Sequence, residues 1–197
     1  VNKNWQVMLK TPYFYLIFAM LCTGAFSGLM IASNASVIGQ QMFSLTAATA
    51  AAYVSLYSLS NCVGRVFWGT ISDKLGRNKT LNFILTMIIV AFIILVVVSA
   101  QLGFAIGIIS LGLGFGGVMG VFPPMVMENY GPVNQGVNYG IIFSGYSAAA
   151  FFAPKVAANM AASNDGDFSK AFYVAIVVAC VGLVLNIIYM QLKKKDN

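Results

Sequence analysis

The sequence predicts an all-α membrane protein, a bundle of six transmembrane helices built as a 3+3 inverted repeat. The first reason is composition: 59% of the 197 residues are hydrophobic and 8% are charged, whereas soluble domains have about 25% charged residues. The second is that the apolar residues form runs of about 20, enough for a helix to cross a bilayer. The third is that the starts of the first three runs, shifted by about 89 residues, fall on the starts of the last three.

The six predicted spans form one domain over residues 1–197. They lie at residues 13–34, 47–70, 79–100, 103–129, 136–160 and 168–192. The third span has no glycine and is apolar on all sides, and the sixth is similar apart from Gly182 and Asn186, so both are expected to face lipid. In the fourth span, Gly112, Gly116 and Gly120 form a flat stripe that permits close helix packing.

The repeat also has a local match in sequence. Residues 26–30, Phe-Ser-Gly-Leu-Met, resemble residues 115–119, Phe-Gly-Gly-Val-Met, at the equivalent place in the fourth span. An odd number of spans in each unit makes the second unit start from the opposite face of the membrane. This is the inverted arrangement that is nested in secondary transporters.

The basic residues predict the orientation of the bundle, because an even number of spans puts both termini on one side. That side carries Lys3, Lys10, Lys74, Arg77, Lys79, Lys193, Lys194 and Lys195. The other side carries Lys170 and Lys155. The positive-inside rule therefore predicts that both termini are cytoplasmic. The net charge of +6 follows from this topology, so the lipid bilayer and not a nucleic acid is the expected partner.

Arg65 lies inside a predicted span that is otherwise uncharged, since residues 47–64 before it contain no charged side chain and the next charge is Asp73. An unpaired cation inside a membrane costs about 2.5–3.5 kcal/mol on insertion scales, so such residues usually face a cavity, a partner or an anion. No intramembrane carboxylate in this chain is near enough in sequence to neutralise it. Arg65 is therefore predicted to bind an anion.

The face of the helix around Arg65 supports this interpretation. Asn61, Ser58, Tyr57 and Trp68 lie within about 80° of it on a helical projection. The guanidinium would hold a carboxylate through two parallel hydrogen bonds, and the amide and hydroxyl groups would complete the site. The alternative is that Arg65 extends toward the cytoplasm or caps backbone carbonyls there.

The segment GTISDKLGRNK at residues 69–79 contains the predicted cytoplasmic loop, residues 71–78. It resembles the G-x-x-x-D-x-x-G-R signature of the major facilitator superfamily. Gly69 is expected to let the helix end approach a neighbour, and Gly76 to adopt the positive φ of a short reversal. Asp73 is expected to accept hydrogen bonds from an adjacent helix N-terminus. Arg77 is expected to pair with Glu128, the one carboxylate at the same end of another span.

Major facilitator transporters have twelve spans in two halves, so the resemblance implies that this chain is one six-helix half. Residues 5–15, 61–69, 128–131 and 138–140 resemble the seventh, eighth, tenth and eleventh helices of the oxalate/formate antiporter family. The resemblance implies the C-terminal half of a secondary transporter of the bacterial inner membrane that moves a small organic anion by alternating access. Its expected partner is the N-terminal half, and pairing of two isolated copies is a second expectation.

The family resemblance also implies a second cation on the eleventh helix in members that bind dicarboxylates, and here Tyr146 stands at that position. A monocarboxylate is therefore favoured over a dicarboxylate. Phe115 and Met119 are expected to form apolar walls of the cavity or simply to pack. Lys155 lies on another side of its helix from Tyr146 and is expected to reach the membrane surface or an outer vestibule.

Other functions are less consistent with the sequence. Proton coupling is not favoured, because the predicted spans carry no mid-membrane Asp, Glu or His. A six-helix channel or assembly module, or a major facilitator for sugars or drugs, remains as an alternative. The sequence contains no nucleophile–base pair and no phosphate-binding loop, so an enzyme is not expected. The three cysteines lie in separate spans and the chain has no histidine, so neither a metal site nor a cofactor is expected.

Overall fold

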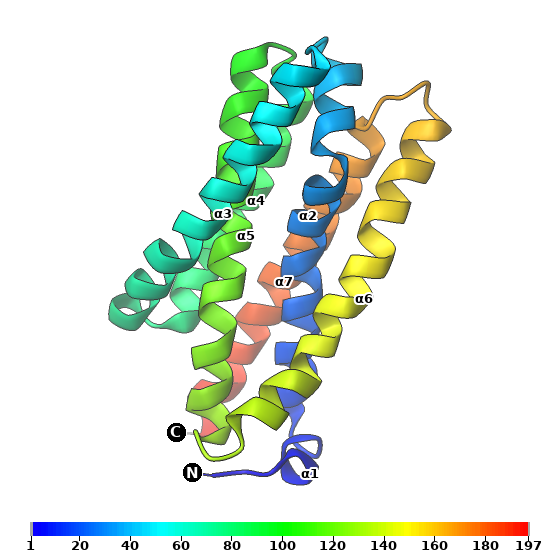
Figure 1. Cartoon of the computed structure of the whole chain (residues 1–197). Coiled ribbons are helices and arrows are strands. Elements are labelled where there is room, and N and C mark those ends of the chain that lie inside the picture. Colours follow the sequence, from blue (N-terminus) through cyan, green and yellow to red (C-terminus); the bar gives the residue numbers. More distant parts are fainter. Residues whose placement is uncertain (1, 197) are drawn as a thin grey trace.

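The computed structural model describes residues 2–196, and these residues form helices and no strand. A short helix, α1 (Trp5–Met8), precedes six long ones. The long helices are α2 (Pro12–Phe43), α3 (Ala47–Leu75), α4 (Arg77–Val97), α5 (Gln101–Tyr130), α6 (Gln135–Ala162) and α7 (Ser169–Asp196). They run up and down in one bundle, and the N and C labels lie at the same end, which we call the termini end (Figure 1).

Each predicted span coincides with one long helix, and the largest difference is that α2 continues to Phe43. Five of the long helices are long and apolar enough to cross a membrane: α2, α4, α5, α6 and α7. The remaining one, α3, has 29 residues and lies alongside α5 in the bundle (Figure 1). Its lower apolarity comes from serines and from Asn61 and Arg65, the polar stripe that the sequence had marked as functional.

Local sequence signals explain where several helices begin and end. Pro12 starts α2 at the position where a missing backbone N–H costs nothing. The Thr46 hydroxyl caps α3 by accepting a hydrogen bond from the Thr49 backbone N–H at 3.2 Å. Gly76 alone separates α3 from α4, and its φ of +86° is one that glycine adopts readily, so the predicted reversal at this residue is confirmed.

The helix packing has the symmetry expected of an inverted repeat in which α2, α3 and α4 correspond to α5, α6 and α7. The two most extensive contacts, α3 with α5 and α2 with α6, exchange when the triplets are swapped. So do the contacts of α4 with α5 and of α7 with α2, whereas the α2–α5 and α4–α7 contacts map onto themselves. The contact pattern is thus the same for both triplets, as the 3+3 repeat predicted.

The glycine stripe of α5 packs directly against the backbone of α3. A Cβ atom on Gly112 would lie 2.7 Å from the Tyr57 carbonyl oxygen, and one on Gly120 would lie 2.6 Å from that of Arg65. A Cβ atom on Gly116 would collide with the Asn61 carbonyl oxygen. The stripe therefore fixes α3 at three successive turns, and these turns carry the residues predicted to bind the anion.

Candidate functional site

Arg65 lies on α3 about 15 Å along the helix axis from its end at Leu75, well inside the bundle. Its side chain is exposed, and its Nε donates a hydrogen bond to Oδ1 of Asn61, one turn earlier, at 3.2 Å. The described residues contain two salt bridges, and both are made by Arg77. Within this part of the molecule, the guanidinium of Arg65 thus has no carboxylate partner.

An aromatic wall stands beside Arg65. The α6 side chains of Tyr139, Phe143 and Tyr146 contact one another in sequence, with ring centroids 5.4 Å apart for the first pair and 4.7 Å for the second. The ring of Phe115 on α5 is nearly parallel to that of Tyr146, with centroids 6.3 Å apart. Among these rings, Tyr139 is the one close enough to Arg65 for an electrostatic interaction.

The structure brings only some of the predicted site residues to an accessible place. Tyr57 is 4% exposed, and its hydroxyl donates a hydrogen bond to the Gly28 carbonyl oxygen at 2.7 Å, which links α3 to α2. It also lies within electrostatic reach of Tyr146. Phe115 and Met119 are buried in the core. Arg65, half-buried Asn61 and half-buried Tyr146 therefore remain the accessible members of the predicted set.

Two residues of the aromatic wall were not among the predicted site residues. Tyr139 falls within the family-like segment 138–140, and the sequence marks Phe143 only as an apolar residue of the fifth span. Their signal in the sequence is the spacing of Tyr139, Phe143 and Tyr146, which puts aromatic rings on one face of a helix at positions i, i+4 and i+7. The same spacing also occurs in ordinary core helices, so it gains meaning only once Arg65 is seen beside it.

Lys155, the other cation well inside a long helix, does not join this site. Its side chain is exposed on α6, and its Nζ lies 3.6 Å from the centroid of the Phe151 ring. A cation over an aromatic face is stabilised by the ring quadrupole. Arg65 is thus not supported by a second cation from Lys155.

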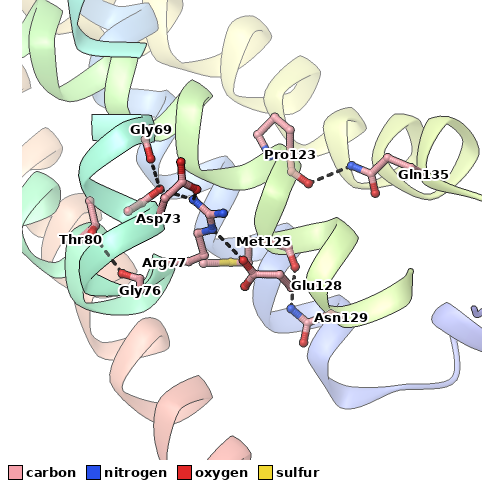
Figure 2. A network of polar contacts seen from close by, with 11 residues as sticks. Gly69, Asp73, Gly76, Arg77, Thr80, Pro123, Met125, Glu128, Asn129 and Gln135 are labelled. Carbon is pink, nitrogen blue, oxygen red and sulfur yellow. Dashed lines mark hydrogen bonds and ion pairs between the residues drawn. The ribbon is translucent and has the colours of Figure 1, made fainter. Parts of the chain in front are cut away.

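The second group of predicted residues forms a closed network around Arg77 (Figure 2). Its Nη1 lies 2.6 Å from Oδ1 of Asp73, and its Nε lies 2.9 Å from Oε1 of Glu128. The predicted pairing of Arg77 with Glu128 is therefore present. Arg77 also donates a hydrogen bond to the hydroxyl of Ser72, which in turn donates to the Gly69 carbonyl oxygen at 2.7 Å. The network joins the α3–α4 connection to the end of α5.

Two details of this loop concern Gly69 and Asp73. The close helix approach expected at Gly69 stays a prediction, because among the described residues a Cβ atom there would meet nothing within 4 Å. The face of α3 at Gly69 is open, and this glycine acts through its carbonyl oxygen, which accepts the Ser72 hydroxyl. The partner that the structure gives Asp73 is the side chain of Arg77, the first residue of α4, and not a backbone N–H of that helix terminus.

The segment before α2 is tied to the connection between α5 and α6. The Lys3 backbone N–H donates to the Tyr130 carbonyl oxygen at 2.8 Å, and the Lys3 carbonyl oxygen accepts a hydrogen bond from Nδ2 of Asn138 at 2.9 Å. Asn138 is fully buried. The Nε2 of Gln135 also reaches back to the Pro123 carbonyl oxygen at 2.8 Å. The termini end of α6, below the aromatic wall, is thus held by several side-chain hydrogen bonds.

Comparison with known proteins places the chain among transporters. A family model described as Major Facilitator Superfamily matches residues 1–154. An uncharacterized MFS-type transporter, YhjX of Escherichia coli (strain K12), is 30% identical over 150 residues, which is 74% of this chain and 37% of that protein. The oxalate:formate antiporter of Oxalobacter formigenes is 28% identical over 185 residues, 92% of this chain and 43% of that protein. The chain thus spans about two fifths of these relatives.

A solved structure supports the fold. The crystal structure of a peptide transporter POT, an E310Q mutant in complex with alafosfalin, superposes with a TM-score of 0.78. The match covers 90% of this chain and 38% of that chain at 19% sequence identity. At this identity the similarity concerns the arrangement of the helices and not the substrate.

Proposed function

Because the chain belongs to the Major Facilitator Superfamily, we propose that it forms half of a secondary transporter that carries a small organic anion, with Arg65 binding its carboxylate. The family and the apolar helices make the protein an integral, multi-pass membrane protein. Its relatives are transporters and not enzymes. Both termini are proposed to lie in the cytoplasm and the protein in the bacterial inner membrane, in accord with the distribution of basic residues.

The unpaired guanidinium of Arg65 carries this proposal. Asp73 and Glu128, the two carboxylates nearest in sequence and in the loop network, are bound to Arg77. The hydrogen bond that the Arg65 side chain makes is to the side chain of Asn61 on its own helix, and Tyr139 of α6 is near enough to interact with its charge. A cation held inside a membrane protein without a fixed counter-charge is suited to an anion that arrives and leaves.

One cation favours one carboxylate. Tyr146 stands where the family resemblance would put a second cation, and Lys155 is engaged with Phe151. The aromatic rings of Phe143 and Tyr146 offer an apolar surface to the rest of the solute. The similarity to a protein named as an oxalate:formate antiporter supports a small carboxylate as the transported anion. The single unpaired cation favours a monocarboxylate, moved by exchange or by facilitated transport.

The proposed partner is the other six-helix half of the same transporter. On the face of α3 that carries Arg65, the side chains of Ser58 and Cys62 are also exposed. Gly69 on α3 and Gly140 on α6 have open space where a Cβ would be. A second half on this face would cover these side chains and close the site around the anion.

The test is uptake by the full-length transporter in liposomes, with labelled formate as the monocarboxylate and labelled oxalate as the dicarboxylate. Arg65→Ala should lower formate uptake roughly 10- to 100-fold, the range expected for losing hydrogen bonds to a charged group. Lys155→Ala is the matched control, because it removes a cation from another helix, and it should transport like the unaltered protein. Full formate affinity in Arg65→Ala would refute the assignment of Arg65.

A further inference from the structure

A polar contact joins the start of α4 to the last turns of α7, on the side of the bundle away from Arg65. The Nδ2 of Asn186 donates hydrogen bonds to the Asn78 carbonyl oxygen and to Oδ1 of Asn82, each at 2.8 Å. Asn186 is fully buried, and Nδ2 of Asn82 lies 3.8 Å from the sulfur of Met190. These contacts fix the relative position of two helices whose other faces are strongly apolar.

Two neighbouring hollows lie at this contact, and we call them together the α4–α7 groove. One has a volume of about 300 Å³ and is lined by Asn78, Met190, Lys193 and Lys194. The other has a volume of about 380 Å³ and is lined by Lys79, Asn82, Phe83 and Thr86. Asn82 of one hollow contacts Met190 of the other, so the two hollows are adjacent. Three lysines from two helices thus border this pair of hollows.

We propose that the α4–α7 groove binds the phosphate headgroup of an anionic lipid. The residues that line the two hollows include three lysines and no carboxylate, and these lysines make no salt bridge among the described residues. Asp73 and Glu128, the acidic residues at this end with described side chains, are bound to Arg77 in the α3–α4 loop network. A phosphate between Lys79 and Lys194 would neutralise charges that the chain itself leaves unpaired.

The surroundings of the groove favour a lipid over a free anion. Phe83, which lines one of the hollows, is 60% exposed, and Ile187, two turns before Lys194 on the same face of α7, is 40% exposed. An apolar surface therefore continues from the lysines along the helices toward the middle of the membrane. A phosphate joined to acyl chains matches both parts, whereas inorganic phosphate matches only the basic end.

The test is native mass spectrometry of the full-length protein in detergent with phosphatidylglycerol or phosphatidylcholine of the same acyl chains. Phosphatidylglycerol should be retained preferentially. The double variant Lys79→Gln/Lys194→Gln should weaken its apparent affinity roughly 25-fold, about fivefold for each lysine. The charge-preserving variant Lys79→Arg/Lys194→Arg should restore most of it, which separates loss of charge from misfolding.

The matched control is Lys10→Gln/Lys170→Gln, which removes the same charge from places outside the groove and should leave lipid retention unchanged. An equal loss in this control would show that the lipid responds to the net charge and not to a site. Unchanged retention in Lys79→Gln/Lys194→Gln would also refute the proposal. Competition by inorganic phosphate at the same concentration as the lipid would show that the groove takes free anions.

Discussion

Arg65 and Arg77 have opposite surroundings, although they lie only about three helical turns apart along the chain. The side chain of Arg77 is 12% exposed and contacts three acceptors, on Ser72, Asp73 and Glu128. Arg65 is exposed and has one hydrogen bond, to an amide on its own helix. Within the described residues, the chain gives one guanidinium two carboxylate partners and the other none. This difference separates an arginine that holds the loop together from one suited to a passing ligand.

The packing behind each arginine differs in the same way. Behind Arg65, the backbone of α3 lies on the glycines of α5, so the position of the side chain is set by contacts that involve no charge. Around Arg77, the geometry depends on the ion pairs themselves, because Gly76 gives the α3–α4 reversal little stiffness of its own. Substitutions at the two places should therefore change different measured properties.

The largest effect is expected where α5 supports Arg65. Gly116→Ala should lower the free energy of unfolding by roughly 3 kcal/mol, because the new methyl group collides with the Asn61 carbonyl oxygen and must push α3 away. Denaturation in detergent, followed by loss of helical circular dichroism, measures it. Gly140→Ala is the control, since nothing lies within 4 Å of its Cβ position. Equal destabilisation by both variants would mean that helix packing at Gly116 is not the cause.

The next effect is expected at Arg77. Arg77→Ala should lower the free energy of unfolding by about 2 kcal/mol, because it removes hydrogen bonds to two carboxylates. The loss is limited because both carboxylates are partly exposed and water can solvate them in the variant. Arg65→Ala should leave the same denaturation curve within about 0.5 kcal/mol, because it breaks no ion pair. If the two variants were equally destabilised, the contrast between the two arginines would be wrong.

Glu128→Gln should have a smaller effect than Arg77→Ala. The amide oxygen can still accept the hydrogen bond from Nε of Arg77, but the attraction between opposite charges is lost, so we expect about 1 kcal/mol. High salt should reduce the difference between the variant and the unaltered protein, since this pair is partly exposed. Denaturation at two salt concentrations measures both values, and a difference independent of salt would contradict an electrostatic origin.

Tyr139→Phe is expected to have the smallest effect. It keeps the ring that packs against Phe143 and removes the hydroxyl group, which interacts with the charge of Arg65. The half-saturating formate concentration should change roughly threefold or less, and unfolding should not change. Phe143→Tyr adds a hydroxyl to the same wall and serves as a comparison. A loss as large as that of Arg65→Ala would make Tyr139, and not the cation, the main determinant of anion binding.

The positions of the helices could be predicted because apolar runs of bilayer length leave little choice of structure. The pairing of Arg77 with Glu128 was also predictable, because the loop signature supplied the cation and Glu128 was the one carboxylate available to it. The membrane span least supported by apolarity is α3, because the polar residues of the candidate site lie on this helix.

Other features depend on contacts that the sequence does not contain. The glycines of α5 have an obvious period, but the period does not say that the facing backbone belongs to Tyr57, Asn61 and Arg65. The hydroxyl of Tyr57 is used by a backbone carbonyl of α2, and a carbonyl acceptor has no signature in a sequence. Tyr57 therefore looked like a ligand-binding residue although the structure gives its proton another partner.

The hydrogen bonds of Lys3 have a mechanical consequence. They join the stretch of chain that leads into α2 to Tyr130 and to Asn138, one at each side of the turn between α5 and α6. Tyr130 is the last residue of α5 and Asn138 lies on α6, so a tilt of α6 relative to α5 would either pull on that incoming stretch or break the hydrogen bond from Asn138 and uncover its amide. The position of the helix that carries the aromatic rings is thereby coupled to the chain that precedes α2.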